Sequence, residues 1–228
     1  MKTTLKTFLV LGAFAGISSA AMGQVSFTIN FDTEDNWIAG SGGITSYQDD
    51  HSYNEGNWSF TSDDSLRQTS ADQGDVPGAL DVYSWRVRGQ TGDVWTATYD
   101  STLPTGESFT EFSFQARRWS GDDPEFEVYY SFDGGTEYSQ ANDIGSVDFS
   151  DNEWVTFSQA IASPSGLSGG DFLVEIRSTT SANERFMVDQ FSAMTAIPEP
   201  STYAAIFAGL ALGIVVWRRK FVRKDSCG

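Results

Sequence analysis

Apolar and polar residues alternate in short segments along most of this chain. A period of two places the apolar side chains of a strand on one face. The alternating segments are 25–31, 58–60, 80–87, 94–99, 112–114, 126–132, 155–157, 172–176 and 186–194. Stretches rich in Gly, Asp, Asn and Ser separate them, and no segment between them has a helical period. About ten short strands at this spacing predict an all-β fold, an antiparallel β-sandwich, and we favour a jelly roll.

One hairpin can be predicted in more detail. Alternating segments flank the sequence 120–123, Ser-Gly-Asp-Asp, which is typical of a turn. If Trp119 faces Glu125 across this hairpin, Arg117 faces Glu127 on the outward side. Such a cross-strand ion pair would support the register.

The N-terminus has the three parts of a secretory signal peptide. Lys2 and Lys6 are basic, residues 8–17 are apolar, and residues 18–23 supply the small side chains that a signal peptidase accepts. We therefore assign residues 1–23 to a signal peptide. The alternative is an uncleaved anchor, but the apolar part is too short to span a bilayer.

The C-terminus carries a longer apolar run, Tyr203–Trp217. Fifteen helical residues span about 22 Å, and flanking residues extend this toward the ~30 Å of a hydrocarbon core. The run predicts a single transmembrane helix at about residues 202–217. Arg218, Arg219 and Lys220 follow it and would hold that end in the cytoplasm, which places the preceding domain outside.

A short motif precedes the predicted helix. Pro198-Glu199-Pro200, a hydrophobic helix and an arginine cluster, on a chain with a signal peptide, resemble the PEP-CTERM sorting domain of Gram-negative, exopolysaccharide-producing bacteria. The resemblance covers about residues 197–219, and we assign residues 197–228 to the sorting signal. It implies that an exosortase recognises Pro198, Glu199 and Pro200, that the chain is transiently anchored in the inner membrane, and that it is then exported to the cell surface or extracellular matrix.

The remaining residues, 24–196, suffice for one domain with a substantial core. This domain contains no lysine, seven arginines and 29 acidic residues, a formal charge of −22. Such a surface repels nucleic acid and anionic lipid. The chain's one cysteine, Cys227, lies outside the domain, so packing, or packing together with a bound metal, must stabilise the domain without a disulfide.

Three segments of the domain resemble a loose group of secreted jelly rolls. Residues 127–135 (Glu-Val-Tyr-Tyr-Ser-Phe-Asp-Gly-Gly), 154–157 and 186–191 are similar to galactose-binding-like and carbohydrate-binding-module-like sandwiches. The resemblance implies a structural calcium between an acid after the first strand and an aspartate in the last.

Carried over, the implied calcium ligands are Asp32 or Glu34 together with Asp189. Acidic loops suit calcium, which prefers carboxylate and carbonyl oxygens. The alternative interpretation is that these loops are acidic for solubility.

Catalytic patterns are poor. His51 is the single histidine, and the G-x-S-x-G match at 166–170 has no histidine downstream of its serine. Glu125 and Glu127 share a strand face and would sit about 7 Å apart, a spacing compatible with glycoside hydrolysis. A solvated acidic face explains them better, so we assign no catalytic residue.

The aromatic residues suggest glycan binding, because sugar rings stack on flat aromatic faces. Most tryptophans are expected in the core. Trp119 stands apart, since two arginines adjoin it in the sequence, two more could lie near it, and the four could form an anionic-glycan site with it. These arginines are Arg86, Arg88, Arg117 and Arg118. The alternative is ordinary charge balancing.

Together these patterns predict a non-catalytic exported protein with a structural, adhesive or glycan-binding role in extracellular polysaccharide. The competing hypothesis is a secreted polysaccharide-degrading enzyme or its carbohydrate-binding accessory domain. Exposed aromatics and carboxylates in an open groove would favour the enzyme, and buried tryptophans would favour the structural protein.

Overall fold

The computed structural model describes residues 22–47, 50–69, 72–73, 76–119, 121–144, 153–198, 207–212 and 214. Gly23–Ile197 form one compact unit. Its described elements are fifteen strands and one 3-10 helix. They are β1 (Met22–Ile29), η1 (Glu34–Asn36), β2 (Trp37–Ala39), β3 (His51–Glu55), β4 (Trp58–Ser62), β5 (Ser65–Thr69), β6 (Asp72–Gln73), β7 (Val76–Pro77), β8 (Tyr83–Gly89), β9 (Val94–Tyr99), β10 (Ser108–Arg118), β11 (Phe126–Ser131), β12 (Ser139–Ile144), β13 (Val155–Ala160), β14 (Leu173–Ser178) and β15 (Glu184–Pro198).

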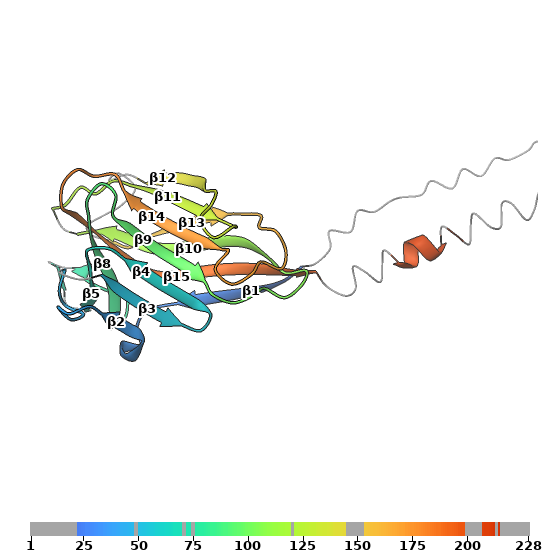
Figure 1. Ribbon diagram of the computed structural model, residues 1–228, viewed down its shortest axis with the longest axis horizontal. Helices are drawn as coiled ribbons and strands as arrows, with labels where there is room; N and C mark the ends of the chain where they lie inside the picture. Colours follow the sequence, from blue (N-terminus) through green and yellow to red (C-terminus); the bar gives the residue numbers. More distant parts are fainter. Residues whose placement is uncertain are drawn as a thin grey trace, which may run out of the picture. The chain divides into compact units, whose positions relative to one another are not determined.

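Two sheets face each other (Figure 1). The six-stranded sheet has the order β13-β10-β15-β8-β5, with β1 also paired to β15, and the seven-stranded sheet has the order β12-β11-β14-β9-β4-β3-β2. Their strands pair antiparallel. The predicted all-β antiparallel sandwich is confirmed, and the arrangement is consistent with a jelly roll.

Large aromatic side chains fill the space between the sheets. Trp58, Trp85 and Trp95 are buried there, as the alternating pattern predicts for inward-facing positions. The ring of Trp58 meets that of Phe191 at 4.9 Å between centroids with an interplanar angle of 63°. Edge-to-face contacts of this kind add to the free energy gained by burying the rings. Aromatic packing thus stabilises a domain that has no cysteine.

The predicted hairpin between β10 and β11 is wrong. β10 pairs with β13 and β15, whereas β11 pairs with β12 and β14 in the other sheet. The segment after Trp119 therefore crosses between sheets instead of folding back within one. Arg117 does not face Glu127, because the two residues lie on different sheets.

The first and last strands bring the two ends of the unit together. The Thr28 and Ser192 hydroxyls lie 2.9 Å apart, and a Cβ added at Gly23 would lie 3.9 Å from the Ile197 carbonyl oxygen. Ala196, just before Ile197, pairs with Ser108 at the start of β10. We call this end of the sandwich the terminal pole.

The β11–β12 turn also lies at the terminal pole. Its Gly134 amide donates to the Asp171 carbonyl, and the Gly170 amide donates to the Tyr99 carbonyl at the end of β9. The opposite end, which we call the distal pole, holds the turn between β8 and β9 at 90–93 and the segment 121–125 before β11.

The predicted sorting signals lie largely outside the described residues. This applies to residues 1–21 of the signal peptide, to Glu199 and Pro200, and to Arg218, Arg219 and Lys220. Of the predicted transmembrane helix, residues 207–212 and 214 are described and are helical. Taken by itself, the described part of the chain contains no helix that is long and apolar enough to cross a membrane.

Candidate functional site

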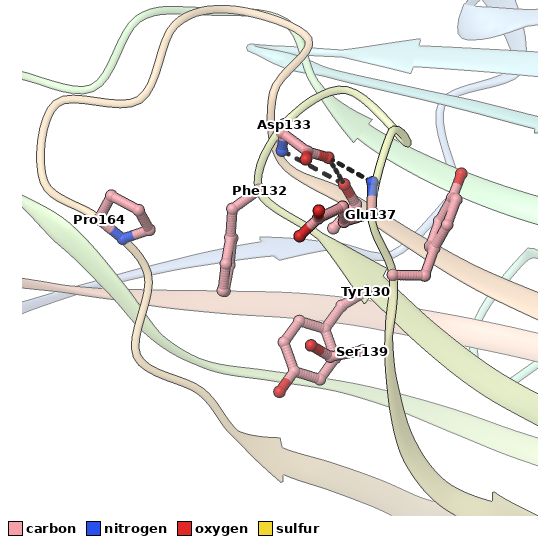
Figure 2. Close-up of a pocket in the computed structure, with 8 residues that line it drawn as sticks. Tyr130, Phe132, Asp133, Glu137, Ser139 and Pro164 are labelled. Atoms are coloured by element: carbon pink, nitrogen blue, oxygen red, sulfur yellow. Dashed lines mark hydrogen bonds between the residues drawn. The ribbon is translucent and has the colours of Figure 1, made fainter.

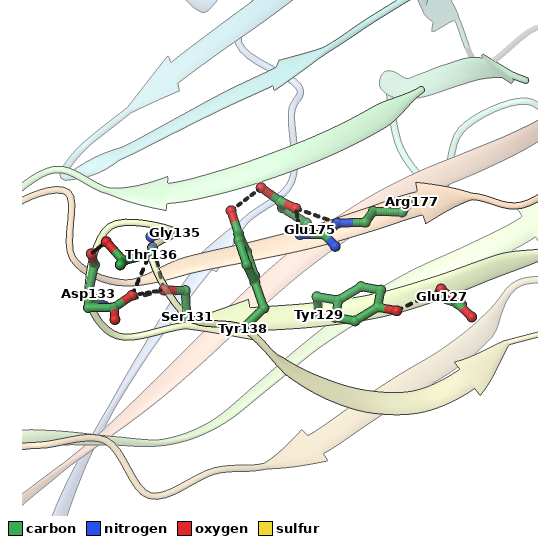
Figure 3. Close-up of polar contacts among 9 residues, drawn as sticks. All are labelled: Glu127, Tyr129, Ser131, Asp133, Gly135, Thr136, Tyr138, Glu175 and Arg177. Carbon is green, nitrogen blue, oxygen red and sulfur yellow. Dashed lines mark hydrogen bonds and ion pairs between the residues drawn. The ribbon is translucent and has the colours of Figure 1, made fainter. Parts of the chain in front are cut away.

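The β11–β12 turn is organised by one aspartate. The Asp133 Oδ1 atom accepts hydrogen bonds from the Thr136 amide at 3.0 Å, the Glu137 amide at 2.9 Å and the Ser131 hydroxyl at 2.8 Å. The Gly135 amide in turn donates to the Ser131 hydroxyl at 3.0 Å. Figure 3 shows this network at the end of β11. The turn is therefore a preorganised loop.

The same contacts keep Asp133 charged. The Glu137 amide, followed by the Ser131 hydroxyl, lowers the pKa of Asp133 below its ordinary value. Gly134 and Gly135 have φ angles of 70° and 84°, which explains why glycines occupy both positions. The sequence Ser131–Glu137 thus specifies one turn shape.

A pocket of about 290 Å³ opens beside this turn. Its lining comes from β11, the turn, the start of β12 and the segment between β13 and β14, and consists of Tyr130, Ser131, Phe132, Asp133, Glu137, Tyr138, Ser139 and Pro164. Figure 2 shows Phe132, Glu137 and Tyr130 around the opening, with Pro164 across from Phe132. Strands and a hydrogen-bonded turn therefore position most of the lining.

The aromatic part of the pocket rests on the core. The rings of Tyr130 and Phe132 lie 5.4 Å apart, and Phe132 stacks on Phe172 at 5.6 Å with an interplanar angle of 28°. Phe172 is buried. This contact fixes the ring of Phe132, while Glu137 and Ser139 add a carboxylate and a hydroxyl. The pocket can thus offer an apolar wall and polar groups to one small ring.

The outer face of the seven-stranded sheet carries a second group, which we call the Tyr129–Tyr138 face. It consists of Glu127, Tyr129, Tyr138, Glu175 and Arg177 (Figure 3). The Arg177 guanidinium carbon lies 4.2 Å from the Tyr129 ring centroid and 4.3 Å from that of Tyr138. The Glu175 carboxylate binds Arg177 at 2.6 Å.

Both tyrosine hydroxyls on this face are engaged. Tyr138 donates to Glu175 at 2.6 Å, and Tyr129 donates to Glu127 at 2.7 Å. Burial, followed by the contact with Glu175, raises the pKa of Tyr138. Arg177 covers part of each ring, so this face is a closed network of polar contacts more than an open stacking platform.

The structure brings part of the predicted anionic-glycan group together at the distal pole. The Arg86 guanidinium carbon lies 4.2 Å from the Trp119 ring centroid, and both Arg86 and Arg88 contact the ring of Tyr47, at 5.1 and 4.9 Å. Trp119 is only 8% exposed. Arg88 forms a bidentate pair with Asp64 at 2.8 and 2.9 Å.

The other two predicted arginines are placed differently. Arg117 is fully buried, donates to the Pro77 carbonyl at 3.1 Å and lies 5.7 Å from the Trp154 ring centroid. Arg118 pairs with Asp123 at 3.4 Å. Arg117 is therefore part of the interior and not available to a ligand.

Asp32 and Glu34, the two alternative calcium ligands predicted beside Asp189, both have partners in the protein. Asp32 Oδ1 accepts the Val82 and Tyr83 amides at 2.8 and 3.0 Å. Glu34 is held by Arg67 at 3.2 Å and by the Tyr83 hydroxyl at 3.1 Å. These contacts, led by the hydrogen bond from Arg67, lower the pKa of Glu34. Glu34 therefore already has a cationic partner.

Asp189 is the most unusual carboxyl of the described chain. It is 1% exposed, and its oxygens accept the Leu80 and Gln190 amides at 2.9 and 2.7 Å. Burial, with smaller contributions from the charges of Asp32 and Asp81, raises its pKa to about 8. Among the described residues, no group of three or more Asp, Glu, His or Cys could hold a metal ion. Calcium stays a prediction that requires ligands beyond these three side chains.

Sequence reasoning did not identify the pocket. The segment 127–135 carries one local signal of the site, an aspartate followed by two glycines, which is typical of a turn. Pro164 lies 32 residues after Phe132 in the sequence. Nothing in the local pattern indicates that these two residues line one opening.

No protein-family model matches this chain, and the search of curated proteins gave no match. Solved structures similar to it include the CBM22-1 xylan-binding domain of Paenibacillus barcinonensis Xyn10C, with 17% identity over 79% of this chain and 99% of that one, and a TM-score of 0.47. The xylan-binding module CBM15 has 11% identity, covers 78% of this chain and 99% of its own, and has a TM-score of 0.43.

A third similar structure is TmCBM61 in complex with β-1,4-galactotriose. It has 13% identity over 60% of this chain and 86% of that one, with a TM-score of 0.40. Identities and TM-scores this low assign neither a ligand nor an activity to the present chain.

Proposed function

We propose that this chain is an exported, non-catalytic protein whose sandwich binds polysaccharide in the pocket beside the β11–β12 turn. Its role would be structural or adhesive within extracellular polysaccharide. The observation that carries the proposal is the pocket itself, which is lined both by the rings of Tyr130, Phe132 and Pro164 and by the polar residues Glu137 and Ser139.

This combination suits a sugar ring. The C–H face of a pyranose packs on an apolar wall, and its hydroxyls require polar partners at the edge. The pocket volume lies near the lower end of the range for ligand sites, so it would hold about one sugar unit. We therefore propose that it takes one unit of a chain and leaves its neighbours in solvent.

A non-catalytic role is supported by the state of Asp133 at the pocket. Glycoside hydrolysis requires a carboxylic acid with a raised pKa beside a second carboxylate. The turn contacts lower the pKa of Asp133 instead, which disfavours the protonated form. His51 is 1% exposed in β3, and three strands separate β3 from β11 in the sheet.

The tryptophans support the same interpretation. Trp37, Trp58, Trp85 and Trp95 belong to the core, and Trp119 is nearly buried. Five of the six tryptophans in the described sandwich are therefore buried, and the sixth, Trp154, is half-buried.

Export and processing complete the proposal. A signal peptidase would remove residues 1–23, and an exosortase would act at Pro198–Pro200 and release the chain from the inner membrane to the surface or matrix. The described helical residues suit a lipid-facing segment by composition, since Phe207, Leu210 and Leu212 are apolar. Mass spectrometry of the protein from culture tests this step. Retention of Trp217 and Arg218 on the mature form, in cells that have the processing enzyme, would contradict it.

Glycan-array binding tests the pocket, with two matched variants. Ser139→Trp places a bulky ring at the pocket lining, and Gln140→Trp places it at the next residue, which points to the other side of β12 and pairs with Tyr129 on the outer face. We expect wild type and Gln140→Trp to bind the same glycans and Ser139→Trp to bind none. The reverse result would move the site to the Tyr129–Tyr138 face, and no binding by wild type would remove the glycan-binding role.

A further inference from the structure

We propose that the pocket selects sugars with a free amino group, so that the preferred polymer is a hexosamine chain that is at least partly N-deacetylated. Glu137 would pair with the sugar ammonium group. This inference rests on the proposed polysaccharide binding and names its chemical class.

Glu137 is the pocket carboxylate whose side chain takes no part in the hydrogen bonds of the turn. The Asp133 carboxylate is oriented by two amides and a hydroxyl of its own turn, which all donate to Oδ1. Glu137 contributes only its backbone amide to that network, and the residue is exposed to solvent. Arg177, whose guanidinium carbon lies 4.3 Å from the ring centroid of the pocket residue Tyr138, pairs with Glu175. In the described part of the chain, no arginine forms an ion pair with Glu137.

The pocket lining has a one-sided charge. It contains Asp133 and Glu137 but no arginine, lysine or histidine. A uronic acid or another anionic sugar would meet repulsion there without a compensating cation. An ammonium group would instead form a charge-assisted hydrogen bond, which is shorter and stronger than a bond between neutral groups.

The charge of the whole domain acts in the same direction. Residues 24–196 carry seven arginines against 29 acidic residues. Six of these arginines lie on the six-stranded sheet, on β5, β8, β10 and β15, away from the pocket strands. A polycationic glycan would therefore be drawn to the domain over a distance, and the potential would be most negative where arginines are few.

The apolar wall explains why the ligand is an amino sugar and not a simple amine. Phe132 and Pro164 offer carbon surfaces on two sides of the opening. A small alkylamine would satisfy Glu137 but leave these surfaces in water. A pyranose ring that carries an amino group can contact both the wall and the carboxylate.

The test is calorimetric titration of the full chain in detergent with four oligosaccharides of equal length: glucosamine, N-acetylglucosamine, glucose and glucuronic acid. We expect the glucosamine oligomer to bind roughly tenfold tighter than its N-acetylated counterpart, and the glucuronic acid oligomer to bind weakest. The preference should shrink as salt is raised, because ion pairs at an exposed site are screened.

Two charge-matched variants separate the pocket from the surface. Glu137→Gln removes the pocket carboxylate, and Glu125→Gln removes an exposed one at the opposite end of β11. We expect Glu137→Gln to bind glucosamine and N-acetylglucosamine oligomers equally and Glu125→Gln to keep the wild-type preference. Equal loss in both variants would assign the preference to general surface charge and overturn the inference.

The outcomes also separate this inference from the function on which it rests. Equal wild-type affinity for amino, acetylated and neutral oligomers would overturn amine selection and leave polysaccharide binding in place. Binding of no oligomer at all would overturn both.

Discussion

Arg86 stacks on Trp119, with its guanidinium carbon 4.2 Å from the centre of the indole ring. A second arginine, Arg185, approaches the same ring at 5.9 Å. Stacking with an arginine occupies an aromatic face that would otherwise be open to a sugar, and such contacts stabilise partly buried sites. In this arrangement Trp119 links the end of β10 to β8 and β15.

We therefore expect Trp119→Ala to lower the free energy of unfolding by about 3 kcal/mol, because it removes a nearly buried indole. Chemical denaturation of wild type and variant measures this loss. Trp119→Phe is the control and should retain most of the stability, since a smaller ring still packs beneath Arg86. A Trp119→Ala variant of normal stability that loses binding to acidic polysaccharide would instead support the anionic-glycan site predicted from the sequence.

Neighbouring aspartates at the distal pole should differ greatly in their contribution. Asp122 is buried and accepts from Arg185 Nε at 2.6 Å, from Arg185 Nη2 at 2.9 Å and from the Arg185 amide at 2.8 Å. Asp123 makes an exposed pair with Arg118 at 3.4 Å.

We expect Asp122→Ala to cost about 2 kcal/mol of folding free energy and Asp123→Ala less than about 1 kcal/mol. Denaturant titration of the two variants gives the comparison. Similar losses would show that the bidentate pair contributes no more than a surface ion pair.

The buried carboxyl of Asp189 predicts a pH dependence of stability. Its pKa in the folded protein is about 8, whereas an aspartate in an unfolded chain titrates near 4. Between these two pH values the folded state therefore holds a proton that the unfolded state releases. The contribution of Asp189 to the free energy of unfolding is thus largest below about pH 4 and decreases as the pH rises toward 8. The slope approaches about 1.4 kcal/mol per pH unit in this window.

Asp189→Asn should flatten this dependence, because asparagine is neutral throughout. Melting temperatures of both proteins from pH 4 to 9, measured with a chelator present, test the expectation. Parallel curves for variant and wild type would show that Asp189 is not the group responsible.

Calcium would reverse that trend if it binds near Asp32 and Asp189. A cation requires the deprotonated carboxylate, so its stabilising effect should grow as the pH rises through 8. Calcium at a hundred times its dissociation constant would add about 2.7 kcal/mol. Melting with calcium and with chelator at pH 6 and pH 8.5 measures the effect, with Asp189→Asn as the control. No difference at either pH would remove the calcium prediction.

The alternating pattern predicted the fold class and much of the core. Phe112, Phe114, Val174 and Ile176 are buried as period two requires. The pattern did not predict strands that have few apolar residues. Ser139–Ile144 has few apolar residues, and it still forms β12 because β11 offers a partner edge.

Pairing partners were harder to predict than strands. A turn-like sequence at 120–123 suggested a hairpin, but the same residues also suit a crossing between sheets, and period two does not say which. The first strand shows another limit, since Val25 was expected to face inward and is 38% exposed, whereas Ile29 is buried. Among the described strands β1 pairs with β15 alone, and Ile29 belongs to the core whereas Val25 does not.

The candidate site was predictable only in part. Arg86 and Trp119 were expected to lie close together and are in contact. The burial of Arg117 and the pairing of Arg88 with Asp64 and of Arg118 with Asp123 were not predicted from the sequence. The pocket combines β11, β12 and Pro164 and could not be found from any one segment.

Gly23 at the start of β1 and Ile197 near the end of β15 lie side by side on paired strands. A short peptide joining them would close the sandwich into a ring, and new ends could then be opened at the exposed turn near Gly92. Such a circular permutant would present the pocket on a scaffold free of its native ends, so that glycan recognition could be measured apart from sorting.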